Sequence, residues 1–105
     1  MIIVNTHEVA GKTIRETIGI VRGNAVRAKW VGADIVAGFK NIIGGRLSQY
    51  EELMTEAREA AIAEMKADAE KLGADGIVNV HFSTSQIAQG AAEILVYGTA
   101  VKFKK

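Results

Sequence analysis

The chain has 105 residues, with 13 Lys and Arg against 12 Asp and Glu, and it contains neither Cys nor Pro. A net charge of +1 gives no electrostatic reason to expect nucleic acid or an anionic membrane as a partner. The absence of Cys excludes disulfides, thiolate metal sites and a thiol nucleophile. We expect one domain spanning residues 1–105, soluble and cytoplasmic, because the sequence has no signal-peptide pattern and no stretch near the roughly 20 apolar residues of a membrane helix.

The first third of the chain favours strands. Residues 2–4 form a short apolar run that suits one edge strand, and residues 13–27 are rich in β-branched side chains, which fit a pleated surface. Gly19 and Gly23 interrupt this second run, and Gly inside a strand often marks a bulge or a close backbone approach. Gly23-Asn24 also suits a tight turn, since both residues tolerate positive φ. We predict a long, bent strand.

The middle of the chain changes to a helical period. Apolar positions at i, i+3, i+4 and i+7 predict a short helix over residues 34–43, with Asp34 as its N-cap and Gly44-Gly45 as its stop. The spacing is carried by Ile35, Gly38, Phe39 and Ile42.

A long helix is predicted from Ser48 to Leu72. Ser48 and Glu51 fit the S-x-x-E capping box, and Gly73 suits the left-handed position that ends a helix. Small side chains in its middle allow a close approach to a sheet; these are Ala57, Ala60, Ala61 and Ala63.

The C-terminal third contains two apolar runs, residues 77–82 and 94–101, separated by a loop over residues 85–90. Simple alternation along strands places Val78, Val80 and Phe82 on one face of the first run, and Ile77, Asn79 and His81 on the other. In the second run Ile94, Val96 and Ala100 oppose Leu95, Tyr97, Thr99 and Val101. The predicted fold is α+β, a two-layer β-α-β-β arrangement in which one long helix packs on one face of an antiparallel sheet.

One helix covers only one face of such a sheet. The other face keeps Leu95, Tyr97, Val101 and Phe103, or the opposite set if the two faces are reversed, and exposing them loses roughly 25 cal/mol per Å² relative to burial. Large exposed apolar patches usually mark interfaces. We therefore expect self-association, with closed cyclic symmetry as the usual form.

Six motifs in fixed order resemble the YbjQ family of small bacterial and archaeal proteins. They are Val21-x-Gly23-Asn24-x-Val26, Gly32-x-Asp34-Ile35-x-Ala37-Gly38, Ile43-Gly44-Gly45-x-x-x-x-Tyr50, Glu56-Ala57-Arg58, Leu72-Gly73-Ala74-Asp75 and Gly98-Thr99-Ala100-Val101. The resemblance implies a subunit similar to dodecin, a ring-shaped homopentamer, and a heavy-metal-binding label without an established ligand set or activity. The lack of Cys weakens that label for this chain.

Metal binding has two weak candidates, His7 and His81, with Glu8, Asp75 and Glu93 as candidate oxygen ligands. No H-x-x-x-H pair and no acidic calcium loop occurs. The simpler interpretation is that His7 is a loop residue and His81 a strand residue facing solvent or an interface. A symmetric ring could still gather one His from each subunit.

Three other candidate sites are each outweighed by a simpler interpretation. Gly44-Gly45-Arg46 before a helix could bind an anion, but a tight turn explains it better. Ser83, Thr84 and Ser85 lie near His81 in sequence, but no catalytic geometry follows from that. Arg27, Lys29 and Trp30 could stack a flat or anionic ligand, but packing of Trp30 against a neighbouring subunit is favoured.

No catalytic residue and no cofactor is assigned from the sequence. The sequence favours a non-enzymatic ring that binds a small ligand or metal ion at subunit interfaces, with no nucleic acid and no membrane as partner. The alternative is an enzyme whose site is shared between subunits, using His81 or Asp75 beside Arg27 and Trp30.

Overall fold

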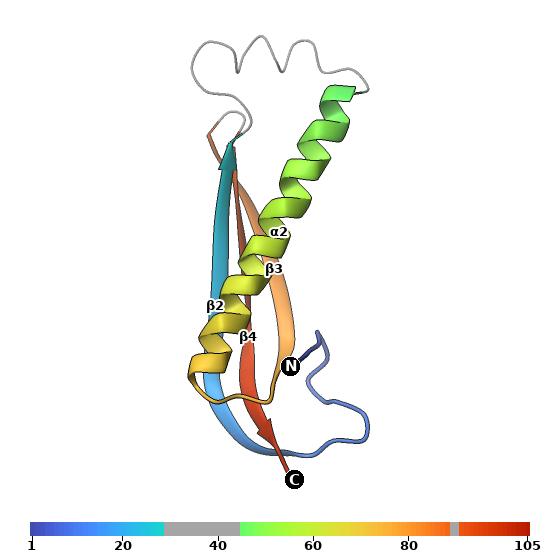
Figure 1. Cartoon of the computed structure of the whole chain (residues 1–105), viewed down its shortest axis with the longest axis vertical. Coiled ribbons are helices and arrows are strands. Elements are labelled where there is room, and N and C mark those ends of the chain that lie inside the picture. The colour runs from blue at the N-terminus through green and yellow to red at the C-terminus, as the bar shows by residue number, and fades with distance from the viewer. Residues whose placement is uncertain (29–44, 89–90) are drawn as a thin grey trace.

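A computed structural model describes residues 1–28, 45–88 and 91–105. A four-stranded sheet in the order β1-β3-β4-β2 is crossed on one face by a single long helix of the described part (Figure 1). Its elements are β1 (Ile2–Ile3), β2 (Ile14–Ala28), α2 (Gly45–Lys71), β3 (Gly76–Ala88) and β4 (Ala91–Phe103). The α+β class and the helix-on-sheet layers are confirmed. The short helix predicted over residues 34–43 lies outside the described residues.

The sheet is mixed, and the prediction of an antiparallel sheet is wrong at β1. β4 is antiparallel to both β2 and β3, whereas β1 pairs in parallel with the start of β3, Ile2 opposite Gly76. Val4 continues this pairing, since its N–H donates to the Ile77 carbonyl at 3.0 Å. A run of two or three apolar residues contains no sign of the strand's direction, so the sequence could indicate the edge strand but not its orientation.

α2 begins at Gly45, three residues before Ser48. Ser48 therefore lies inside the helix, and the capping-box interpretation is wrong, because the backbone is already helical over the preceding turn. The predicted end is confirmed: Gly73 has φ 74°, its N–H donates to the Glu70 carbonyl at 3.0 Å, and the Ala74 N–H donates to the Ala69 carbonyl at 3.1 Å. This pair of bonds is the Schellman motif that closes a helix.

The backbone of α2 lies directly against the backbone of β2. A Cβ atom added at Gly23 would lie 2.0 Å from the Ala61 carbonyl oxygen and 2.6 Å from the Met65 nitrogen. Gly23 sits in the middle of β2, so the close-approach interpretation is confirmed and the tight-turn alternative is wrong. The helix face at this contact repeats every four residues and is fully buried; it consists of Ala57, Ala61, Met65 and Ala69.

A bulge at Asn79 changes the face of every later residue of β3. Asn79 has φ 55°, and the register with β4 shifts between Val78, opposite Thr99, and His81, opposite Tyr97. Val78 consequently packs with Val101 on the face away from α2, and Val80 packs beneath α2. The predicted alternation, which put Val78 and Val80 on one face, is wrong because it assumed a regular strand.

The N-terminal segment covers the lower half of the face away from α2. Val78, Val101 and Phe103 form a cluster there against four partly buried side chains, Ile2, Val4, Val9 and Ile14. Val101 is 1% exposed and Phe103 7% exposed, so the expectation that both await a partner subunit is wrong. Residues 2–14 supply the missing cover from the same chain.

Gly23→Ala should destabilise the protein by about 2 kcal/mol or more, because the new methyl group meets helix backbone that cannot rotate away. Urea denaturation followed by circular dichroism measures the change. Asn24→Ala, on the exposed side of the same strand, is the control and should stay within about 0.5 kcal/mol of the unsubstituted protein. Equal stability of the two variants would contradict the close helix–strand contact.

Candidate functional site

The candidate site is the upper half of the sheet face turned away from α2, which we call the open face. Three strands supply it in three rows, each row joined by the register of the sheet. The rows are His81–Tyr97–Arg22, Ser83–Leu95–Asn24 and Ser85–Glu93–Val26, written from β3 through β4 to β2. The bulge at Asn79 places His81 in the first row, because without it His81 would face α2.

Aromatic and polar side chains meet within and between the three rows. The rings of His81 and Tyr97 lie 5.7 Å apart between centroids and are tilted by 32°. His81 Nε2 lies 3.2 Å from Asn79 Oδ1, a hydrogen bond whose donor depends on the His tautomer. The Asn24 amide donates to the Glu93 carboxylate at 3.3 Å. The described side chains of the open face therefore make few polar contacts with one another.

The predicted metal candidates do not come together. His7 lies in the exposed loop after β1, whereas His81 lies on β3. Within residues 1–28, 45–88 and 91–105, no three His, Asp or Glu side chains are grouped so that they could hold a metal ion. Glu93 instead accepts a hydrogen bond from Asn24. The described part of one subunit therefore offers a metal ion only two imidazoles, and they lie apart from each other.

Asp75 has a structural partner at the other end of β3. Its carboxylate accepts the Phe103 N–H at 2.9 Å and so ties the turn before β3 to the end of β4. Six residues of extended chain separate it from His81, about 20 Å at the usual rise of a strand. Asp75 and His81 of one subunit therefore cannot act on one substrate atom.

No nucleophile is activated by His81 in the described structure. Ser83 shares the face of His81 and Thr84 lies on the other, as predicted, since Ser83 is opposite Leu95 and Thr84 is opposite Ile94. The only side chain within hydrogen-bond reach of the His81 ring, among described residues, is Asn79. A Ser–His pair needs a hydrogen bond between the two groups, which is not formed here.

The other sequence candidates lie away from the open face or outside the described residues. Arg27 turns to the helix side, where its Nε lies 3.5 Å from Glu56 Oε1. Lys29, Trp30 and Gly44 lie outside the described residues. Gly45 and Arg46 belong to the first turn of α2, so the tight-turn interpretation does not hold for them.

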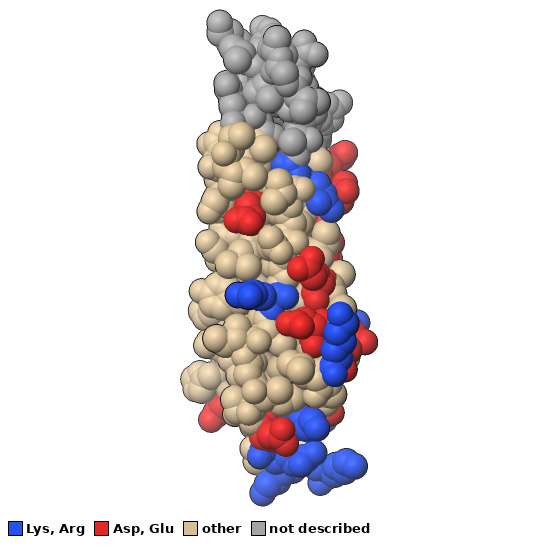
Figure 2. Space-filling view, turned by 90° about the vertical axis from the view of Figure 1, so that its left-hand side faces the viewer, with Lys and Arg blue, Asp and Glu red and all other residues tan. Residues whose placement is uncertain are grey.

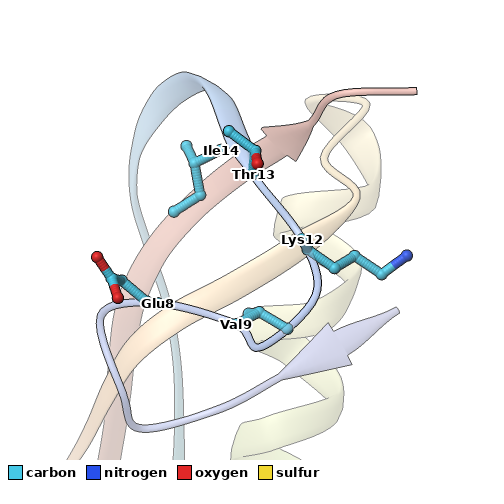
Figure 3. Close-up of a pocket in the computed structure, with 5 residues that line it drawn as sticks. All are labelled: Glu8, Val9, Lys12, Thr13 and Ile14. Atoms are coloured by element: carbon cyan, nitrogen blue, oxygen red, sulfur yellow. The ribbon is translucent and has the colours of Figure 1, made fainter.

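A shallow hollow of about 380 Å³ lies under the N-terminal loop (Figure 3). In the close-up Glu8 and Lys12 extend in opposite directions, so their charges do not converge on a common ligand. The Lys12 ammonium lies 5.8 Å from the centre of the Phe103 ring, a cation–π contact that helps to hold the loop on the sheet. The hollow belongs to the packing of the N-terminal segment. Its lining consists of Glu8, Val9, Lys12, Thr13 and Ile14.

The sequence did not predict a second feature, an apolar groove of about 450 Å³ between α2 and the outer strands β1 and β3. α2 packs over β2 and β4 and scarcely touches β3, so α2 leaves the helix side of β3 uncovered (Figure 1). Phe82 is 49% exposed at the rim of this groove. The large side chain at position 82, followed by small polar residues, was the signal in the sequence. The groove is lined by Ile3, Val4, Asn5, Ile62, Met65, Val80, His81 and Phe82.

The fold and the open face define a small α+β protein without an assembled catalytic group among its described residues. The chain belongs to the YbjQ family, whose sequence profile, described as "Putative heavy-metal-binding", matches residues 1–104. A UPF0145 protein from Methanosarcina acetivorans is 53% identical over 97% of this chain and 96% of its own length. Another UPF0145 protein, from Thermosipho melanesiensis, is 58% identical over 97% of this chain and 94% of its own.

A solved structure supports the fold. The crystal structure of a protein of unknown function from Pediococcus pentosaceus aligns with a TM-score of 0.59 over 99% of this chain and 98% of that one, at 19% identity. Among the described residues, no helix has the length and apolar character needed to cross a membrane.

Asn79→Val should destabilise the protein by about 1–2 kcal/mol, because a β-branched residue disfavours the left-handed conformation of the bulge. Asn79→Gly is the matched variant and should change the stability by less than ~1 kcal/mol, since Gly adopts positive φ freely. Chemical denaturation compares the two. Equal losses in both variants would mean that the side chain of Asn79, rather than its backbone, is what the fold needs.

A Zn²⁺ titration of the dissociated subunit should show no tight site, because one copy supplies two separated imidazoles and its described residues place no third ligand close to either. Protein purified without an affinity tag is examined by elemental analysis and isothermal titration, and His7→Ala should titrate like the unsubstituted protein. Tight one-to-one binding that is lost in His7→Ala or His81→Ala would contradict this assignment.

Proposed function

We propose that the chain is the subunit of a non-enzymatic homo-oligomer, a closed ring in the cytoplasm that binds a small ligand or an ion between subunits. The observation that supports it is the position of the exposed apolar side chains. Ile20 is 78% and Val26 47% exposed on β2, and Phe82 is 49% and Ile87 54% exposed on β3. These residues lie on the two outer strands of the sheet, Ile20 and Val26 on the open face and Phe82 on the face toward α2, so each flank of the subunit carries exposed apolar surface.

The charge distribution favours the same role for the β2 flank (Figure 2). Figure 2 views the molecule from the side of β2; charged side chains gather on the right, where α2 lies, and at the lower end, and the remaining surface carries few of them. Burying apolar surface contributes roughly 25 cal/mol per Å², and fewer charges mean less desolvation to offset it. A subunit with two different apolar flanks associates head to tail, and head-to-tail contacts close into a ring when the rotation between neighbouring subunits divides a full turn evenly. Resemblance to the family implies five subunits.

The open face supports binding rather than catalysis. In a ring the row His81–Tyr97–Arg22 is repeated once per subunit, which gives a band of aromatic rings beside cationic groups. Such a band suits a small anionic or flat ligand through stacking and cation–π contacts. The alternative, an enzyme with a site shared between subunits, has no specific observation in its favour, since Asp75 and Arg27 are engaged with Phe103 and Glu56.

Sedimentation velocity at micromolar concentration should give one species of about five times the 11.2 kDa subunit mass, because a closed ring has a fixed size whatever the concentration. Val26→Lys should shift the protein toward smaller species, since it puts a charge on an apolar flank. Ala63→Lys, which adds the same charge to an exposed position of α2, is the control and should sediment as before. A folded, stable monomer at these concentrations would end the proposal.

A further inference from the structure

No described residue pairs with the outer edge of β3 along its upper half, which we call the free edge. β4 pairs with β3 on one side, whereas β1 reaches only its first residues, Ile2 opposite Gly76 and Ile3 opposite Ile77. Two further bonds extend this cover, from the Asn79 N–H to the Thr6 carbonyl at 2.7 Å and from the Val80 N–H to the Val4 carbonyl at 3.1 Å. Beyond Val80 the described part of the chain places nothing on the outer side of β3.

The unpaired backbone groups of this edge can be assigned. The Val80 N–H points outward, away from β4, since it bonds Val4. Backbone groups alternate sides along a strand, and the register with β4 runs without a shift from His81 to Gln86. Phe82, Thr84 and Gln86 therefore present N–H and C=O groups outward. Together they form a ready template for one more strand.

The free edge has none of the devices that usually discourage strand addition. Soluble proteins protect exposed edges with charged residues, Pro or bulges. Residues 82–86 contain no charge and no Pro, and no register shift interrupts them. On β2, Arg15, Glu16 and two register shifts before Gly19 protect the lower half, whereas the upper half has an unbroken register and carries Arg22 and Arg27. The lack of such protection on the upper edge of β3 favours its pairing with a further strand.

A matching edge lies on the opposite flank of the same subunit. From Ile20 to Ala28, β2 keeps an unbroken register with β4, and its outer side has no strand partner among the described residues. β2 and β3 run in the same direction, because both are antiparallel to β4. They also lie at the same level, since Asn24 and Ser83 are both opposite Leu95.

We propose that the free edge of β3 (Phe82–Ala88) pairs in parallel with the upper edge of β2 (Ile20–Ala28) of a second copy of this chain. The inference rests on the proposed homo-oligomer and adds which surfaces join. Because the two edges share direction and level, neighbouring copies are related by a rotation about an axis along the strands without a shift along it, and a ring closes when that rotation divides a full turn evenly. The exposed side chains of Ile20 and Val26 in one copy then lie beside the joint on the open face, and Phe82 of the other copy lies beside it on the helix side.

Two other occupants are geometrically distinct. Pairing of β3 with β3 of a second copy is isologous and antiparallel, so it stops at a dimer and leaves both β2 edges free. An unrelated extended peptide would occupy the edge without linking copies. The presence of a second free edge of matching direction and level on the same chain favours the head-to-tail joint.

Cysteine cross-linking tests the joint directly, because the chain has no Cys of its own. Asn24→Cys combined with Ser83→Cys places one thiol on each edge and on the same sheet face. Within one subunit β4 separates the two positions by about 9.6 Å, beyond the ~7 Å limit of a disulfide, so only neighbouring copies can be linked. A second double variant, Asn24→Cys with Ser85→Cys, detects a joint in which the two strands are shifted by two residues relative to each other.

Oxidation followed by a non-reducing gel should give a ladder of covalent multimers ending at the ring in at least one double variant, and no covalent species in any single variant. A covalent dimer from Ser83→Cys or Ser85→Cys alone would show that β3 pairs with β3 of a second copy, and would contradict the proposed joint. An intact oligomer without a ladder in either double variant would overturn the joint and leave the proposed oligomer standing. A monomer would overturn both.

A second variant set tests the backbone bonds. Thr84→Pro removes an outward N–H without removing a bond to β4, and should reduce the oligomer at least tenfold in association constant; Thr84→Val keeps the N–H and should assemble normally. Circular dichroism checks the fold. If the Pro variant does not fold, Thr84→Lys provides the charge that edges use against pairing and should dissociate the oligomer. Normal assembly of every folded variant at position 84 would contradict the joint.

Discussion

The contact between the backbone of α2 and the backbone of β2 at Gly23 determines how the rest of the molecule is arranged. Only a strand position without a Cβ atom, facing the Ala61 turn, allows the helix to lie this close. The contact draws α2 toward β2 and β4 and away from β3 (Figure 1). A 27-residue helix placed over one side of the sheet cannot also cover the other outer strand. The groove beside Phe82 and the free upper edge of β3 follow from that placement.

The two faces of the sheet are covered by different segments, and this difference explains which apolar surface remains exposed. α2 covers one face, and residues 2–14 cover the lower half of the other. Neither α2 nor residues 2–14 cover the upper half of that second face. Leu95 at its centre is half-buried by its neighbours, and the most exposed apolar side chains lie on the outer strands. Incomplete cover is therefore concentrated at the flanks. A small domain gains much from burying such flanks against copies of itself, because its own core is limited.

Regular patterns in the sequence predicted the fold class, and local exceptions to those patterns were not predicted. The helix end at Gly73, the helix face with Ala57 and Ala61, and the alternation of β4 all follow from periodicity and Gly placement. The bulge at Asn79 does not, because a left-handed Asn inside an apolar strand has no distinct spacing. That one residue decides whether His81 faces α2 or the open face. The cover of Phe103 by Val9 and Ile14 was also missed, since it depends on a loop that has no periodicity.

Hydrogen–deuterium exchange of the assembled protein, resolved at residues 82–88, tests the central claim most directly. The amides of Phe82, Thr84 and Gln86 have no acceptor within the described part of one subunit, so only a neighbouring strand would protect them. The account predicts that these three amides exchange as slowly as the strand interior of β4 in the oligomer and rapidly in a dissociated variant. Rapid exchange of all three in an intact oligomer would contradict it.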